Sequence, residues 1–91
     1  MRIARRYVIS GRVQGVGFRY FTQAVADREN INGWVRNTPD GRVEIEAEGD
    51  ADSMWQFDRQ IRTGPIGSRV ETVEATDQMP SEEPGRGFRI R

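Results

Sequence analysis

The order in which strand-like and helix-like segments follow one another is the feature that most limits the fold of this chain. Strand-like segments cover about residues 5–10, 33–37, 42–48 and 69–76. The third alternates clearly, with apolar side chains on one face and three glutamates on the other, which we expect to be solvated. Residues 18–29 and 51–62 carry apolar side chains at i, i+3 and i+7, as amphipathic helices do. A short final strand is predicted at residues 87–91.

The predicted order of strand, helix, strand, strand, helix and strand is typical of the split βαβ, or ferredoxin-like, fold. Right-handed crossovers place both helices on one face of an antiparallel sheet. We therefore predict an α+β sandwich with spatial strand order 4-1-3-2 and a short C-terminal edge strand. In the fourth strand, Val70 and Val73 are three residues apart, which breaks the alternation and predicts a β-bulge. The length of 91 residues fits a single domain over residues 1–91.

The residue types that the chain lacks limit its chemistry. It contains no cysteine and no histidine, and all 14 of its basic residues are arginine. These absences exclude thiol nucleophiles, imidazole bases and ordinary zinc sites, so we expect no metal and no cofactor. The formal net charge of zero disfavours nucleic-acid binding by counterion release. No apolar run resembles a membrane span or a signal peptide, so we expect a cytoplasmic monomer without membrane contact.

A glycine-rich turn separates the first strand from the first helix. Its residues, Gly11 to Arg19, read Gly-Arg-Val-Gln-Gly-Val-Gly-Phe-Arg. Glycines allow backbone N–H groups to converge, and the helix start adds a positive dipole end, so such turns bind phosphate or sulfate. Arg19 opposes the helix dipole unless an anion is bound beside it. A surface ion pair with a carboxylate such as Asp27 is the alternative, but the neighbouring glycines favour the anion site.

The predicted topology brings a second polar residue to this turn. The first and second strands run the same way and end at the same edge of the sheet, where Asn37 ends the second strand. On its own, an asparagine followed by Thr38-Pro39-Asp40-Gly41 is more often a turn residue. A P-loop is excluded because the chain has no lysine, and Tyr20 replaces the third glycine of a dinucleotide fingerprint. The residues alone therefore indicate a small anion site with Arg19, to which Asn37 is a candidate contributor.

The nine residues of the glycine-rich turn, together with Gly33-Trp-Val-Arg-Asn37 and Pro39-Asp-Gly41, resemble the acylphosphatase family. The resemblance covers nearly the whole chain and is loose only from residue 77 to 86. It implies that Arg19 binds the phosphate of an acyl phosphate and that Asn37 positions the attacking water. Thr38 either supports that water or only shapes the turn. The resemblance also implies phosphate binding by the loop amides of Gln14, Gly15, Val16, Gly17 and Phe18.

This function is compatible with the missing residue types. The leaving group of an acyl phosphate is a carboxylate, which is weakly basic and needs little protonation. Phosphoryl transfer can then proceed by positioning and charge stabilisation, without a metal, a cofactor or a covalent enzyme intermediate. Free phosphate or sulfate would compete with the substrate. The alternative is a non-catalytic anion-binding or regulatory module on the same scaffold, which would not need the amide of Asn37.

The predicted final strand runs back toward the edge that carries the anion site. We therefore hypothesise that the carboxylate of Arg91 pairs with Arg19 when no substrate is bound. The competing interpretation is a solvated chain end, which is more common.

Overall fold

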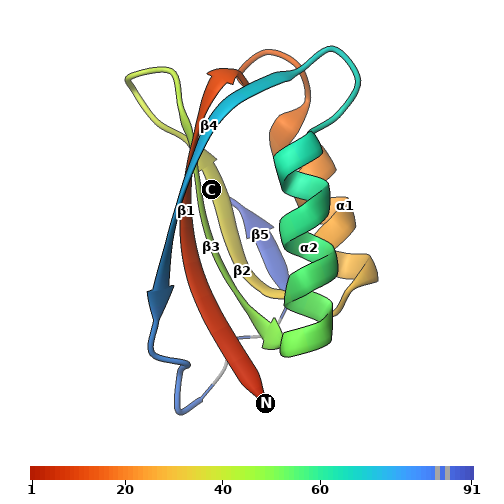
Figure 1. Cartoon of the computed structure of the whole chain (residues 1–91), viewed down its shortest axis with the longest axis vertical. Coiled ribbons are helices and arrows are strands. Elements are labelled where there is room, and N and C mark those ends of the chain that lie inside the picture. The colour runs from red at the N-terminus through yellow and green to blue at the C-terminus, as the bar shows by residue number, and fades with distance from the viewer. Residues whose placement is uncertain (84, 86) are drawn as a thin grey trace.

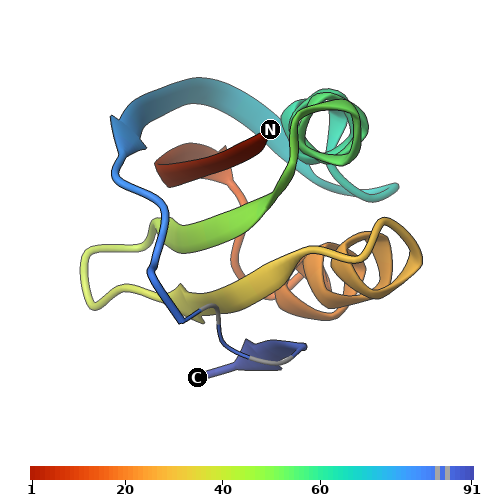
Figure 2. The same ribbon diagram turned by 90° about the horizontal axis from the view of Figure 1, so that it is seen from below.

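The computed structural model describes residues 1–83, 85 and 87–91, so positions 84 and 86 of the loosely matching segment lie outside the described residues. Five strands form one sheet, and both helices cover the same face of it (Figures 1 and 2). This arrangement confirms the predicted ferredoxin-like sandwich. The elements in chain order are β1 (Arg2–Arg12), α1 (Phe18–Arg28), β2 (Asn32–Asn37), β3 (Val43–Asp50), α2 (Ala51–Thr63), β4 (Arg69–Gln78) and β5 (Phe88–Ile90).

The strands lie in the order β4-β1-β3-β2-β5, as predicted. β3 is antiparallel to both β1 and β2, whereas β5 runs parallel to β2 along the edge of the sheet. Val43, the first residue of β3, faces Ile9 of β1 on one side and Asn37 of β2 on the other. The C-terminal ends of β1 and β2 therefore meet at one edge of the sheet.

The core lies between the sheet and the two helices. Phe57 of α2 is fully buried, and its ring centroid lies 6.1 Å from that of Tyr7 in β1 and 6.0 Å from that of Phe88 in β5. The predicted helical stripes face this core, with Phe18 and Val25 buried on α1. Burial of these apolar side chains holds both helices against the sheet.

The predicted bulge is present in β4. Ser10 of β1 faces Thr72, but the next residue, Gly11, faces Val70, so Glu71 is an additional residue on the β4 side. β1 itself is longer than predicted because it continues to pair with β3 back to Arg2.

Two of the three glutamates on the outer face of β3 are not solvated, and that part of the expectation is wrong. The side chain of Glu48 is only 12% exposed and pairs with Arg2 at 3.1 Å. Glu44 is only 6% exposed. Its carboxylate accepts hydrogen bonds from Nε of Arg6 on β1 at 2.7 Å and from Nε of Arg36 on β2 at 2.6 Å. The two arginines reach it from neighbouring strands, and their stems cover the carboxylate. This cluster ties the three central strands together beside the end of β2.

Burial raises the pKa of Glu44, but the hydrogen bonds from Arg36 and Arg6 outweigh burial and hold the pKa below its ordinary value of 4.5. A carboxylate with a lowered folded-state pKa stabilises the protein above the unfolded-state pKa, and this stability is lost as the pH falls through the folded-state pKa.

We predict that Glu44→Gln lowers the free energy of unfolding at pH 7 by about 1–2 kcal/mol, because both arginines are partly exposed. The difference from the wild type should shrink as the pH falls below about 4. Urea denaturation across this pH range measures it, with the exposed Glu82→Gln as the control. A difference that is independent of pH would contradict the assignment.

Candidate active site

The glycine-rich loop between β1 and α1 adopts the conformation that its glycines allow. Gly15 and Gly17 have φ angles of 74° and 77°, in the left-handed region. A Cβ atom at either position would meet no other atom within 4 Å. Glycine is therefore required here by the backbone conformation and not by a lack of space. Gly17 is the N-cap of α1, and no side chain caps the helix.

Backbone donors accumulate where the loop enters α1. Within the described residues, no hydrogen bond is donated by the backbone N–H groups of residues 14–19, and Phe21 donates to the carbonyl of Gly17 at 3.0 Å. The first turn of α1 also contains no acidic residue. A helix start with unpaired N–H groups and its positive dipole end attracts an anion. We call residues 14–19 the cradle.

Arg19 lies in the first turn of α1, on the helix face that also carries Gln23 and lies next to β5. Gln23, one helical turn later on that face, donates through Nε2 to the carbonyl of Phe88 at 3.2 Å. Arg19 is partly buried, and among the described residues it has neither a hydrogen bond nor an ion pair, with Asp27 or with any other carboxylate. The cradle therefore contains, in addition to its amide donors, a guanidinium that has no counterion among the described residues.

Asn37 lies at the end of β2 on the helix-facing side of the sheet, like the buried Val35 two residues earlier. Its Oδ1 atom is buried and has no hydrogen-bond partner among the described residues. Buried acceptors are rarely left unsatisfied, because desolvation without a partner costs free energy. The carbonyl oxygen of this amide is therefore an unsatisfied acceptor at the same edge of the sheet as the cradle.

The turn after Asn37 is held by its own side chains. The hydroxyl of Thr38 accepts a hydrogen bond from the backbone N–H of Arg42 at 3.0 Å and contacts Asp40. The hydrogen bonds from Arg42 and then Thr38 lower the pKa of Asp40 to about 2. Of the two readings of Thr38, these contacts favour a residue that shapes the turn.

The side chain of Gln14 was not anticipated as a structural link. Its Nε2 atom donates to the carbonyl oxygens of Thr38 at 2.8 Å and Arg42 at 2.9 Å. The glutamine side chain is therefore committed to the turn, whereas its backbone N–H remains in the cradle. The sequence shows only that Gln14 is a polar amide side chain between a valine and a glycine in the loop. It does not show which carbonyls this amide contacts.

The hypothesised pair between Arg19 and the carboxylate of Arg91 is not present among the described residues. β5 does run beside β2 toward the site edge, as expected. Arg91 instead donates its backbone N–H to the carbonyl of Val35 at 2.8 Å, and its guanidinium lies 4.4 Å from the ring centroid of Trp34. A cation over an indole face is a favourable contact.

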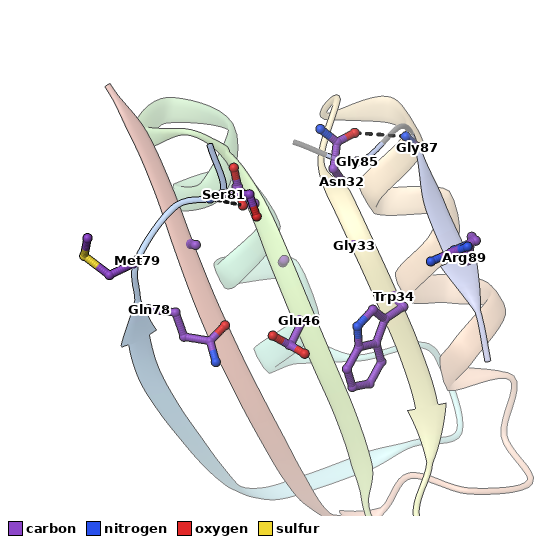
Figure 3. Close-up of a pocket in the computed structure, with 13 residues that line it drawn as sticks. Asn32, Gly33, Trp34, Glu46, Gln78, Met79, Ser81, Gly85, Gly87 and Arg89 are labelled. Carbon is purple, nitrogen blue, oxygen red and sulfur yellow. Dashed lines mark hydrogen bonds between the residues drawn. The ribbon is translucent and has the colours of Figure 1, made fainter. Parts of the chain in front are cut away.

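A pocket of about 400 Å³ lies on the sheet face that the helices leave open. Figure 3 shows the side chains of Trp34, Glu46 and Gln78 along it. None of the predicted site residues lines this pocket, so it is separate from the cradle.

Neither helix in the described part of the chain has the length and hydropathy needed to cross a membrane.

Comparison with known proteins identifies the family of this chain. The acylphosphatase family model matches residues 5–90. An acylphosphatase from Koribacter versatilis is 45% identical over 86 residues, which are 94% of this chain and 77% of that protein. An acylphosphatase from Bifidobacterium longum is 43% identical over 89 residues, which are 98% of this chain and 92% of that protein.

Solved structures give the same result. The crystal structure of acylphosphatase from Bacillus subtilis matches with a TM-score of 0.91 and 42% sequence identity, and the match covers 98% of each chain. The present chain therefore belongs to the acylphosphatase family, and it is an enzyme of that family.

We predict that Gly17→Ala damages anion binding, because an alanine in the left-handed region costs about 1–2 kcal/mol and the loop would relax away from it. Loss of one charge-assisted hydrogen bond should weaken the binding of inorganic phosphate roughly tenfold. Isothermal titration calorimetry measures this change.

Gly67→Ala is the matched control, since Gly67 has a φ of 91° and equal space around it but lies on the loop between α2 and β4. It should lose similar stability and keep its phosphate affinity. Equal weakening of phosphate binding in both variants would remove the special role of the cradle.

Proposed function

We propose that this acylphosphatase hydrolyses the carboxyl–phosphate bond of acyl phosphates by direct attack of water, giving a carboxylate and inorganic phosphate. The observation that carries the proposal is that three kinds of groups without hydrogen-bond partners among the described residues belong to chain segments that meet at one sheet edge. These are the cradle N–H donors, the guanidinium of Arg19 and the buried Oδ1 atom of Asn37. The names of the relatives and the family match support the reaction class.

The cradle supplies the binding step. Backbone N–H groups of Gln14, Gly15, Val16, Gly17 and Phe18 hold the phosphoryl oxygens with Arg19. Fixed donors around a transferring phosphoryl group stabilise the charge that redistributes in the transition state, without reorganisation cost. A planar guanidinium matches two phosphate oxygens at once.

Asn37 supplies the positioning of the nucleophile. Its Oδ1 atom accepts a hydrogen bond from a water molecule and directs a lone pair of that water toward phosphorus. A bond forms between the water oxygen and phosphorus while the bond from phosphorus to the acyl oxygen breaks. The proton of the water passes to a phosphate oxygen, and the leaving group departs as a carboxylate.

The cation that this mechanism requires is Arg19, so we propose that the enzyme works without metal or cofactor. Its substrates are small acyl phosphates, inorganic phosphate and sulfate compete for the cradle, and the enzyme acts as a cytoplasmic monomer. A regulatory anion-binding module would bind phosphate equally well, but it would not turn over benzoyl phosphate.

We predict different effects for the two central side chains. Arg19→Gln should lower kcat roughly 10²–10³-fold and weaken phosphate binding, because the guanidinium contacts the anion throughout the reaction. Asn37→Ala should lower kcat by a similar factor while phosphate affinity stays within roughly threefold, since it contacts the water.

Steady-state hydrolysis of benzoyl phosphate and competitive inhibition by phosphate measure both quantities. Arg59→Gln, on an exposed position of α2, is the control and should behave as the wild type. A near-native kcat in Asn37→Ala would contradict its role.

Activity should be unchanged after exhaustive treatment with EDTA, because every charge-stabilising group in the mechanism belongs to the chain. A metal-dependent phosphatase treated in parallel verifies that chelation was complete. Lost activity that returns on addition of divalent ions would refute metal-free catalysis.

A further inference from the structure

The side chain of Gln14 leaves the cradle in which its backbone lies. Both hydrogens of its amide nitrogen are used, one by the carbonyl of Thr38 at 2.8 Å and the other by the carbonyl of Arg42 at 2.9 Å. These two residues bracket the turn that directly follows Asn37. Among the described residues, no other side-chain hydrogen bond joins residues 13–17 to residues 38–42.

The turn that Gln14 contacts is a closed unit. The backbone N–H of Thr38 donates to the carbonyl of Arg42 at 2.8 Å, and that of Gly41 donates to the carbonyl of Thr38 at 3.2 Å. The threonine hydroxyl accepts from the backbone N–H of Arg42 at 3.0 Å. Because this turn is continuous with β2, a bond to it constrains the position of Asn37 as well.

We propose that the side chain of Gln14 is a positioning residue that sets the spacing between the phosphate cradle and Asn37. The inference rests on the proposed function, in which water on Asn37 must reach phosphorus held by the cradle. Misplacement of reacting groups by about 1 Å can cost roughly 10²-fold in rate. The two hydrogen bonds of Gln14 are the contacts that fix this distance.

This role is separable from phosphate binding and from folding. The cradle conformation depends on Gly15 and Gly17, and the turn is closed by Thr38. Loss of the Gln14 amide leaves two partly buried carbonyls that water can reach, so neither unit loses its own structure. The expected result is slower turnover with nearly unchanged anion affinity.

The test compares Gln14→Leu and Gln14→Glu with the wild type. The first removes the polar group, and the second keeps its shape but replaces the donor with an acceptor. We expect kcat for benzoyl phosphate to fall roughly 10–100-fold in both. The dissociation constant of inorganic phosphate, measured by calorimetry, should stay within roughly threefold in Gln14→Leu, which adds no charge beside the anion. Gln56→Leu, on an exposed position of α2, is the control and should match the wild type.

A double-mutant cycle separates positioning from a general structural role. If Gln14 acts through Asn37, Gln14→Leu should cost less than roughly threefold in kcat when Asn37 is already alanine. Additive losses, or phosphate affinity that falls in proportion to kcat in both Gln14 variants, would overturn the inference.

The inference and the proposed function fail differently. If the wild type hydrolyses benzoyl phosphate and both Gln14 variants keep a near-native kcat, the inference is overturned but the proposed function is not. A wild-type protein that binds phosphate but does not hydrolyse benzoyl phosphate would overturn the proposed function and this inference with it.

Discussion

The position of β3 between β1 and β2 is the constraint on which the site depends. Val43 of β3 faces Ile9 of β1 on one side and Asn37 of β2 on the other. Because β1 and β2 are both antiparallel to β3, they run in the same direction and end at the same edge. The glycine-rich loop leaves β1 at this edge, and Asn37 ends β2 there (Figure 1). If β1 and β2 paired directly as antiparallel neighbours, the glycine-rich loop and Asn37 would lie at opposite ends of the sheet. The strand order that follows from right-handed crossovers therefore also brings together the segments of the proposed active site.

The site differs from the rest of the described chain in how its polar groups are satisfied. Glu44 is held by two arginines from neighbouring strands, and the buried Asp58 accepts hydrogen bonds from Tyr7 and two further arginines. At the sheet edge, in contrast, the amides of the cradle, Arg19 and the Oδ1 atom of Asn37 have no partners among the described residues. Unpaired groups cost stability, and their concentration at one edge indicates a place prepared for a ligand.

Periodicity and turn residues were sufficient to predict the helices, the strands and the bulge between Val70 and Val73, because each depends on residues close in sequence. The strand order then followed from the order of these elements and the crossover rule. Features that depend on distant partners were missed. Glu44 is buried because arginines from two other strands reach it, and the acceptors of Gln14 are backbone carbonyls 24 and 28 residues away. The contact of Arg91 with Trp34 likewise requires the register between β2 and the edge strand β5. Such pairings cannot be predicted from the residue types alone, because they depend on which strands are neighbours and in which register.

A crystal structure of the wild-type enzyme with saturating inorganic phosphate tests the central claim most directly. The account predicts one phosphate with its oxygens about 2.7–3.0 Å from the N–H groups of residues 14–18 and from the guanidinium of Arg19. It also predicts a water on Oδ1 of Asn37, aligned with phosphorus. An unobstructed cradle that stays empty, or a phosphate bound without contact to Arg19, would contradict the account.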